Sequence, residues 1–301
     1  MANVLLSGVT GRIGRAVAQT LAADGKHNLT GLVRQLPDDS AESALPYQPV
    51  LGDFADTQSL TQALADVSSA LLVSNVHPDQ CALQGNFVDA AAAMPQPISL
   101  VKISGLGSQG DSAVDSGRWH ATTEAYMREK GLTAHSLHPY FFMQNLAFAL
   151  AQAKNKGVLS SGVDGDAPIA MVDARDIAAV AARLLVEPDC CADSVLPLTG
   201  TRSYSYREVA ELMSQVLERE VVYQEQTETE LRRALGAAGE PEWHVDIIIQ
   251  FNAAFAAGLG GTPSHYVETI SGQTPRKLPA YLTEVVRSET QAAGRNPFPN
   301  S

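Results

Sequence analysis

The chain has 301 residues, of which 45% are hydrophobic and 18% charged, a composition typical of a globular protein. Its 33 acidic and 21 basic residues give a formal net charge of −12, and the basic residues form no block, so the electrostatic signature of a nucleic-acid-binding protein is missing. No stretch of about 20 residues is apolar enough to predict a membrane-spanning helix. We therefore expect neither a nucleic acid nor a membrane as a partner.

The 3 cysteines, Cys81, Cys190 and Cys191, fit neither a disulfide framework nor the ligand spacing of a metal site. The first residues lack the positive region and the long apolar run of a cleaved signal. These features predict a cytoplasmic protein without a bound metal.

The first half of the chain alternates short apolar runs with amphipathic stretches, the pattern of parallel strands joined by crossover helices. The apolar runs predict strands at residues 4–6, 29–33, 50–51, 70–74, 98–104 and 133–138. The stretches between them predict helices at 12–24, 59–65, 81–93 and 116–130, with Gly25 and Gly131 where two of these helices should end.

Helical patterns predominate in the second half, at residues 174–186, 206–218, 227–235, 242–257 and 278–289, and a short run at 195–198 predicts one more strand. We expect an α/β fold: a Rossmann-type doubly wound parallel sheet with a smaller, mostly helical C-terminal domain. The first domain is predicted at 1–155 with 171–200 returning to it, and the second at 156–170 and 201–301. A ligand is expected in a cleft between them.

Residues 7–14 read Ser-Gly-Val-Thr-Gly-Arg-Ile-Gly, directly after the first predicted strand and at the start of the first helix. In this context Gly8 permits a tight turn, Gly11 lets the backbone approach a pyrophosphate, and Gly14 lets the helix pack closely on the strand. The alternative is a purely structural turn. We predict a dinucleotide site whose loop contacts are Gly8, Thr10, Gly11, Arg12, Ile13 and Gly14.

The second predicted strand ends at Val33 and is followed by Arg34. Sites that prefer NAD commonly carry an acidic residue there for the ribose 2′-hydroxyl, whereas a guanidinium can bind a 2′-phosphate bidentately and stack on adenine. We therefore predict NADP(H) in preference to NAD(H), with help from Arg12; the alternative for Arg34 is an exposed surface charge. Asp53 and Phe54 are predicted beside the adenine, and the alternative for Asp53 is a cap on the following helix.

Further segments resemble a known family: Trp119-His120-Ala121-Thr122-Thr123-Glu124, His138-Pro139-Tyr140-Phe141-Phe142-Met143-Gln144-Asn145 and Val172-Asp173-Ala174-Arg175-Asp176. Together with the glycine loop and the segments 198–200, 206–210 and 272–276, they resemble the NmrA-like group of atypical short-chain dehydrogenases/reductases over nearly the whole chain. The resemblance implies an NAD(P)-binding Rossmann domain with a small substrate-covering domain. Some members of that group reduce quinones, azo or triphenylmethane dyes, isoflavone-like enones or imines, and others only sense the NADP redox state.

Hydride transfer to a polarised double bond needs a nearby proton donor, which typical short-chain dehydrogenases supply with a Tyr-x-x-x-Lys dyad. Tyr126 and Lys130 have this spacing, but they should lie near the far end of the helix that follows the fifth strand, so we expect Tyr126 to be structural and Lys130 to be solvated. If Ser104 is the family's serine, the dyad positions are Ser116 and His120. The group often has a lysine at the second position, so His120 departs from its pattern.

We predict His120 as the catalytic residue, because an imidazole can donate a proton near neutrality. The alternative is a structural histidine bonded to a carbonyl. Ser116 is expected to cap the helix rather than to react.

The loops after the other strands supply the remaining predicted contacts. For the cofactor these are Ser74, Asn75, Val76, Ser104, Gly105, Tyr140 and Phe141, and for the substrate Trp119, Phe142 and Trp243. The alternative for the aromatic residues is ordinary core packing.

The sequence thus favours an NADPH-dependent reductase that transfers hydride to a planar conjugated acceptor, a quinone, dye, enone or imine. The competing hypothesis is a non-catalytic NADP(H)-sensing regulator that binds a protein partner. A biosynthetic reductase or epimerase with another substrate is a third possibility. We expect a small-molecule substrate and a monomer or homodimer.

Overall fold

The computed structural model describes residues 1–38 and 45–294, the part from 289 onward as backbone only. The chain forms two compact units. Unit 1 comprises Met1–Tyr140, Ala174–Leu198 and Ser264–Thr274, and unit 2 comprises Phe141–Asp173, Thr199–Pro263 and the residues from Pro275 onward.

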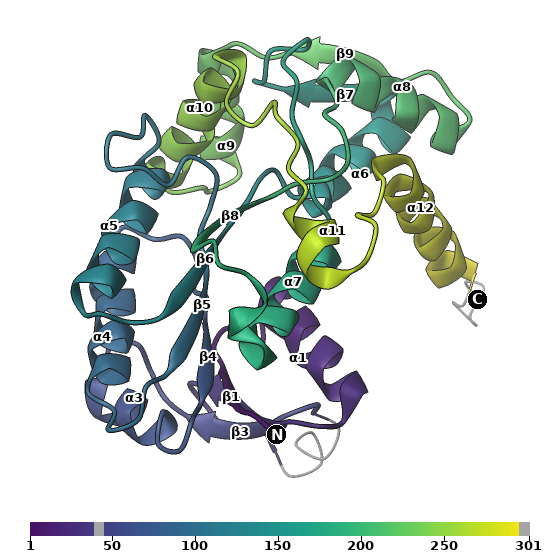
Figure 1. Ribbon diagram of the computed structural model, residues 1–301. Helices are drawn as coiled ribbons and strands as arrows, with labels where there is room; N and C mark the ends of the chain where they lie inside the picture. The colour runs from purple at the N-terminus through teal and green to yellow at the C-terminus, as the bar shows by residue number, and fades with distance from the viewer. Residues whose placement is uncertain (39–44, 295–301) are drawn as a thin grey trace. The chain divides into compact units, whose positions relative to one another are not determined.

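Unit 1 is built on a 7-stranded parallel sheet with the order β3-β2-β1-β4-β5-β6-β8 (Figure 1). The order reverses between β1 and β4, and a doubly wound sheet binds its ligand at such a switch point, outside the carboxyl ends of the strands. The strands are β1 (Asn3–Leu6), β2 (Asn28–Val33), β3 (Gln48–Leu51), β4 (Ser69–Leu72), β5 (Ser99–Ile103), β6 (Ala134–Pro139) and β8 (Val195–Leu198).

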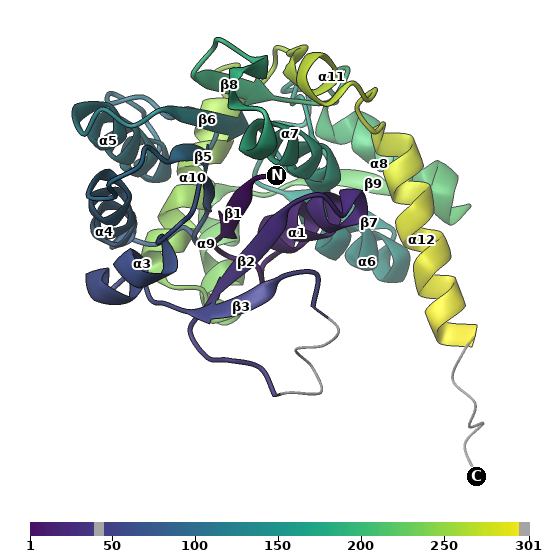
Figure 2. The ribbon, with the colours of Figure 1, turned by 60° about the horizontal axis from the view of Figure 1, so that its bottom comes forward.

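Helices cover both faces of this sheet (Figure 2). One face carries α1 (Arg12–Asp24) and α7 (Ala174–Val186), which pack on each other, and the other carries α3 (Thr57–Ala63), α4 (Gln80–Ala92) and α5 (Asp115–Glu129). The short α11 (Tyr266–Ser271) packs against α7 and β8, and the 3-10 helix η2 (Pro188–Cys190) packs against α7. Two of the predicted stops are confirmed, because Gly25 and Gly131 both adopt a left-handed conformation, with φ of 64° and 70°.

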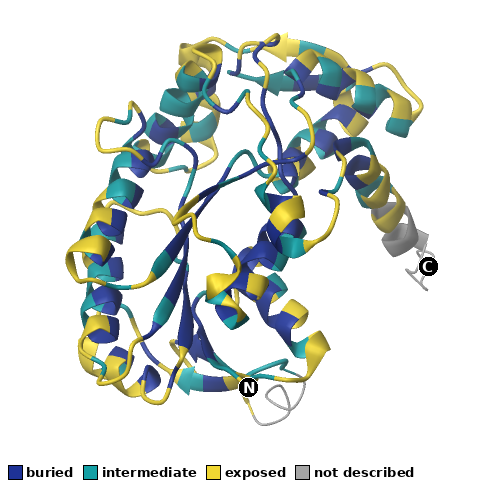
Figure 3. Cartoon of the chain, in the orientation of Figure 1, coloured by how far each residue is buried: buried dark blue, intermediate teal, exposed yellow. Residues whose placement is uncertain are grey.

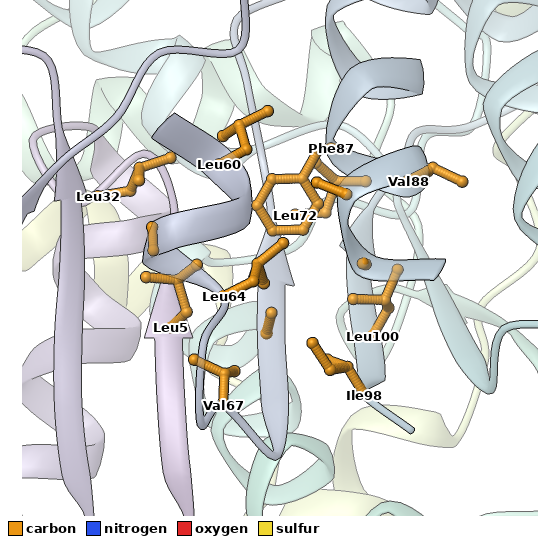
Figure 4. Packing of buried hydrophobic residues seen from close by; sticks show 14 of the residues in the cluster. Leu5, Leu32, Leu60, Leu64, Val67, Leu72, Phe87, Val88, Ile98 and Leu100 are labelled. Atoms are coloured by element: carbon orange, nitrogen blue, oxygen red, sulfur yellow. The ribbon is translucent and has the colours of Figure 1, made fainter. Parts of the chain in front are cut away.

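The core of unit 1 explains why its strands read as continuous apolar runs. All 4 residues of β4 are buried, since helices cover both faces of the sheet (Figure 3). Leu60, Leu72, Phe87 and Leu100 meet between the sheet and the helices α3 and α4 (Figure 4). Phe54 packs edge-on against Phe87 with ring centroids 5.6 Å apart.

Unit 2 combines helices with a 2-stranded parallel sheet of β7 (Val158–Ser161) and β9 (Val222–Glu225). Its helical elements are η1 (Met143–Asn145), α6 (Leu146–Lys156), α8 (Tyr206–Leu217), α9 (Glu228–Ala237), α10 (Glu242–Ala256) and α12 (Leu278–Gly294). Capping boxes begin α8 at Ser205 and α9 at Thr227.

The predicted doubly wound α/β fold is confirmed, with α1, α7 and β8 at the predicted residues and other ends shifted by a few positions. The sequence missed α6, α11 and the pair β7-β9. The observed division also differs from the predicted one: the chain passes into unit 2 after Tyr140 instead of after residue 155, and residues 264–274 return to unit 1. Within the described residues, no helix has both the length and the apolar character needed to cross a membrane.

Candidate active site

The turn between β1 and α1 has a backbone that only glycine fits. Gly8 has φ +61°, and a Cβ placed on it would lie 2.8 Å from Val73 Cγ1. A Cβ on Gly14 would lie 2.3 Å from the carbonyl oxygen of Gly8, so α1 begins directly against the turn. Gly8 is therefore required by the left-handed turn and Gly14 by a close approach, the roles that the sequence predicted for them.

The N-terminus of α1 is open to an anion. Its N-cap is Gly11, which has no side chain to satisfy the first amide groups of the helix. Thr10, Gly11 and Arg12 are exposed, so a phosphate can reach them, whereas Ile13 is buried and can offer a ligand only its backbone. A cradle that a Cβ would fill, followed by an uncapped helix N-terminus, fits the pyrophosphate of a dinucleotide.

Hydrogen bonds of Ser7 connect this turn to the end of β4, at the switch point of the sheet. The Ser7 hydroxyl donates to the carbonyl oxygen of Leu71 (2.8 Å) and accepts from the amide of Val73 (2.9 Å). Ser7 thus joins the carboxyl ends of β1 and β4, although the sequence assigned it no role.

The residues predicted for the adenine half lie at the ends of β2 and β3. Arg34 follows β2 directly and is exposed. Asp53 follows β3 and accepts from the amide of Ala55 (2.9 Å). The cap of α3 is Asp56, whose carboxylate accepts from two backbone amides, so the alternative reading of Asp53 as that cap is wrong.

The loop after β4 contains Ser74, Asn75 and Val76, and buried glutamines of α4 lie beneath it. Gln84 donates from Nε2 to Ser74 Oγ (2.9 Å). Gln84 and Gln80 are both fully buried, and within the described residues neither Oε1 accepts a hydrogen bond. These two amide oxygens are acceptors that a bound water or ligand would satisfy.

Behind the carboxyl end of β5 lies a buried cluster of polar side chains. Lys102 Nζ lies 2.7 Å from Ser104 Oγ and 2.8 Å from His120 Nδ1. Ser104 donates in turn to the carboxylate of Glu124, and His138 Nε2 lies 2.9 Å from the same carboxylate oxygen. All 5 residues have 8% or less of their surface exposed. We name these residues the Lys102 cluster.

The surroundings of His120 determine which ring nitrogen carries the proton. The ammonium of Lys102 can only donate, and Gln80 Nε2 also lies 2.9 Å from Nδ1, so Nδ1 is an acceptor and a neutral ring carries its hydrogen on Nε2. Nε2 lies 3.6 Å from the position that a Cβ on Gly105 would take. The donor edge of the ring therefore faces the loop after β5, at the same edge of the sheet as the glycine turn.

Burial and mutual charge shift the pKa values of the cluster. Burial lowers the pKa of Lys102 to about 7, although the carboxylate of Glu124 opposes the change. Burial, followed by the charges of Lys102 and His138, holds the pKa of His120 well below its ordinary range. Burial alone would raise the pKa of Glu124, but the bonds and charge of His138 and the bond from Ser104 bring it below its usual value. Near neutral pH the cluster therefore pairs a neutral imidazole with a lysine that is poised to release its proton.

Three predictions about the helix α5 have clear outcomes. Tyr126 is structural, as expected: its hydroxyl donates to Asp89 on α4 (2.7 Å). Lys130 is exposed, as expected, and forms an ion pair with Asp89 at 2.6 Å. Ser116 is not the helix cap; α5 begins at Asp115 with Val114 at the N-cap, and Ser116 is buried in the first turn.

The remaining predicted residues divide between the two units. Trp119 is half-buried next to His120. Tyr140 directly follows β6, and its amide donates to the carbonyl of Leu198 (3.0 Å). The other three belong to unit 2. There Phe141 packs edge-on against Tyr206 and Phe255. The backbone of Phe142 forms a β-bridge with that of Val172, and the ring of Trp243 lies tilted beside the ring of His244 on α10.

Sequence reasoning missed Lys102, Glu124, His138 and the two glutamines of α4. The clearest available signal was Lys102 itself, because a lysine inside an apolar strand of a two-faced parallel sheet must be buried and must find polar partners. Glu124 and His138 lie in the family-like segments, but nothing in their spacing marks them as partners of Ser104.

The comparisons identify the family. The model of the NmrA-like family matches residues 2–283, so the chain belongs to the NmrA-like family. The NAD(P)H azoreductase of Xenophilus azovorans is 30% identical over 250 residues, which are 83% of this chain and 86% of that protein.

Solved structures share the fold. An NADPH-dependent quinone oxidoreductase of Escherichia coli in complex with NADPH has a TM-score of 0.84 at 22% identity and covers 94% of this chain and 99% of its own. NmrA, a negative transcriptional regulator, has a TM-score of 0.77 at 17% identity over 98% of each chain. The same fold therefore occurs in proteins described as a reductase and as a regulator.

Proposed function

We infer that this chain is an NAD(P)H-dependent oxidoreductase, and we propose that it prefers NADPH and reduces a planar conjugated acceptor such as a quinone or an azo compound. The observation that carries the proposal is that a candidate dinucleotide site and a hydrogen-bond donor lie at the same edge of one sheet. There a glycine turn and the uncapped N-terminus of α1 fit a dinucleotide, and His120 presents its Nε2 hydrogen beside the loop after β5.

The residues that would bind the dinucleotide follow from this edge. The backbone of Gly8, Gly11 and the first turn of α1 would bind the pyrophosphate. The exposed guanidinium of Arg34 would bind the 2′-phosphate that distinguishes NADPH from NADH, with Asp53 beside the adenosine. NADPH, when bound, supplies a hydride from its nicotinamide ring.

His120 would act on the acceptor. Hydride addition to a quinone or an azo group leaves negative charge on an oxygen or nitrogen atom, and a fixed N–H donor in a water-poor site stabilises that charge. Because conjugation spreads the charge over a planar ring system, such acceptors need less help than a simple ketone, whose reduction leaves a localised alkoxide. Tyr126 is bonded to Asp89 and does not provide the acid of a typical dyad.

The relatives support the same class of reaction. The azoreductase is described as acting with NAD(P)H, and the quinone oxidoreductase was solved with NADPH. Both names concern planar conjugated acceptors. The preference for NADPH over NADH remains our proposal and depends on Arg34.

The test is anaerobic oxidation of NADPH, followed at the nicotinamide absorbance, with quinones, azo dyes, cationic triphenylmethane dyes, enones and cyclic imines. NADH and mixtures without protein are the controls. Acceptor-dependent oxidation that favours NADPH would support the proposal. Tight binding of NADPH without turnover on any acceptor would contradict it and favour an NADP(H)-sensing regulator.

Two substitutions on α5 make the test specific for His120. His120→Phe should lower turnover by about 10²–10³-fold, the usual cost of losing one donor to a developing charge, with little change in NADPH affinity. The matched control is Tyr126→Phe, which removes a hydroxyl from the same helix and should leave turnover unchanged. Equal turnover in both variants would return His120 to a structural role.

A further inference from the structure

We propose that Lys102 is the proton store of the reaction: its ammonium group transfers a proton to His120 Nδ1 in the same step in which His120 Nε2 protonates the acceptor. This inference rests on the proposed reductase function and deepens it, because it names the source of the proton. Lys102 does not touch the acceptor; it acts through His120.

The need for such a store follows from the state of His120. With Nδ1 accepting from Lys102, the neutral ring has only its Nε2 hydrogen to give. A neutral imidazole N–H is a very weak acid, because loss of that hydrogen alone leaves an imidazolate anion. The ring becomes an effective donor only if Nδ1 gains a proton in the same step.

The geometry provides that proton. Lys102 Nζ lies 2.8 Å from Nδ1, which is direct hydrogen-bond distance without an intervening water. Ser104 accepts a second hydrogen bond from the ammonium group at 2.7 Å and donates its own hydrogen bond to the carboxylate of Glu124. Lys102 is thus fixed between one group that can take its proton and one that positions it.

Every group facing Lys102 fits this role. From α5 it meets His120 and the carboxylate of Glu124, from α4 the thiol of Cys81 influences its charge, and from β6 His138 binds Glu124. The pKa of Lys102 is lowered to about 7 by burial, so both its charged and neutral forms are accessible near neutral pH. An unperturbed surface lysine releases its proton far less readily.

The step balances for a quinone, which gains one hydride and one proton to become a hydroquinone. The hydride comes from the reduced cofactor. At the protein, the Nε2–H bond breaks as the quinone O–H bond forms, and an Nζ–H bond of Lys102 breaks as the Nδ1–H bond forms. His120 stays neutral with its hydrogen on the other nitrogen, and Lys102 becomes neutral.

The site is restored after the product leaves. Water protonates Nε2, and the Nδ1 hydrogen returns to the free amine of Lys102. The net change is one proton taken from solvent for each acceptor reduced, and no group other than solvent, cofactor and acceptor is consumed.

The first experiment compares the kinetics of the wild-type protein with those of Lys102→Met and Lys102→Arg, using a quinone as acceptor. Turnover of the wild type should fall as the pH rises through about 7, where Lys102 loses its proton. Lys102→Met should lower kcat by about 10²–10⁴-fold and abolish this pH dependence, with the Kd of NADPH changed less than about twofold. Lys102→Arg keeps the charge but does not release a proton, so it should not restore kcat.

A matched acceptor separates proton supply from other effects. A cationic triphenylmethane dye takes hydride at its central carbon and becomes neutral without a proton. If Lys102 supplies the proton, Lys102→Met should slow quinone reduction but not reduction of such a dye. Equal loss with both acceptors would show that Lys102 supports only the structure of the site and would overturn the inference.

The second experiment needs neither turnover nor cofactor. Nitrogen-15 NMR of the histidine side chains, with His120 assigned by the signal lost in His120→Phe, should show hydrogen on Nε2 and an Nδ1 shift that changes as Lys102 titrates. Lys102→Met should lose that pH-dependent shift. Hydrogen on Nδ1 in the wild type, or no coupled titration, would overturn the inference.

The two proposals can fail separately. Without acceptor-dependent NADPH oxidation the proposed function fails, and the NMR measurement still decides whether Lys102 and His120 share a proton. With quinone reduction intact in Lys102→Met, the function stands and the proton store is wrong. If Lys102→Met does not fold, the wild-type nitrogen shifts decide the question alone.

Discussion

Lys102→Met provides a test of the buried lysine through stability alone. Methionine has nearly the length of the lysine side chain, so it fills the space between β5 and α5 but carries no charge. The exchange removes two hydrogen bonds, to Ser104 and His120, and also removes the cost of burying an ammonium group. These effects have opposite signs and depend differently on pH.

The cost of burying the ammonium group follows from the pKa of Lys102 in the folded and in the unfolded protein. The folded protein has a pKa of about 7 at Lys102, against an ordinary value of 10.5. Between these values the unfolded chain binds more protons than the folded one, so the free energy of unfolding rises with pH. The penalty is fully present below about pH 7, where it amounts to about 5 kcal/mol at about 1.4 kcal/mol per pKa unit, and it disappears above pH 10.5.

Between pH 7 and 9 the other perturbed groups of the cluster do not interfere. The pKa values of His120 and Glu124 lie below their ordinary values of 6.5 and 4.5, and burial raises the pKa of Cys81 above 9.0. Wild type should therefore gain about 2–3 kcal/mol relative to Lys102→Met over these two pH units. Near pH 7 the two proteins should have similar stability, because each lost hydrogen bond of the charged ammonium group costs about 1.5–3 kcal/mol, and the two together are comparable with the cost of burying the charge.

Urea unfolding at pH 7, 8 and 9, followed by the fluorescence of Trp119 and Trp243, measures this difference. Tyr126→Phe serves as the control, since its change in stability should not depend on pH in this range. If the difference between wild type and Lys102→Met stays within about 0.5 kcal/mol from pH 7 to 9, Lys102 is not a buried lysine of lowered pKa, and the reasoning fails.

Three further substitutions test other parts of the site. Arg34→Ala should weaken NADPH binding by about 10–100-fold, the value of a charge-assisted bond, and change NADH binding little; equal losses in a fluorescence titration would refute the 2′-phosphate assignment. Gly14→Ala places a methyl group 2.3 Å from the Gly8 carbonyl and should lower both Tm and NADPH affinity, and an unchanged Tm would contradict the close approach. Tyr126→Phe removes the bond to Asp89 and should cost about 1 kcal/mol in urea unfolding with kcat unchanged; a large loss of kcat would reinstate the dyad.

The fold was predictable because its elements carry signals of short range. The glycine spacing after β1, the apolar runs and the helix stops at Gly25 and Gly131 each act within a few residues. The missed pair β7-β9 has no such signal, since each strand has 4 residues and β9 is mostly exposed. For α6 a signal existed: Leu146, Leu150 and Ala153 are buried at the spacing of one helical face.

The division between the units was harder to predict. A boundary in a sequence is usually sought where a run of loop residues interrupts the pattern. Here Tyr140 still bonds to β8, and Phe141 already bonds to the backbone of Val172 in unit 2. Unit membership thus changes within two residues, without the polar or glycine-rich segment that would mark it.

The candidate site was predicted in part, because the sequence pointed to His120 and Ser104 but not to the residue that joins them. The alternation of side chains along β5 contained the signal that points to Lys102. Side chains two positions apart point to the same face of a sheet, so Lys102 lies on the face of Ser104, the face that α4 and α5 cover. A histidine on α5 aimed at Ser104 must then also meet Lys102.

This placement also explains how the chain can depart from the usual dyad. The family resemblance implies a lysine on the helix at the position of His120, and without that lysine the helix contributes no permanent positive charge to the site. The structure places a lysine of β5 directly on the histidine ring. Lys102 of the strand thus supplies the positive charge that the helix lacks. Because Lys102 is buried, its pKa is lowered to about 7, so its ammonium group can release a proton near neutral pH, whereas a solvated lysine would keep it.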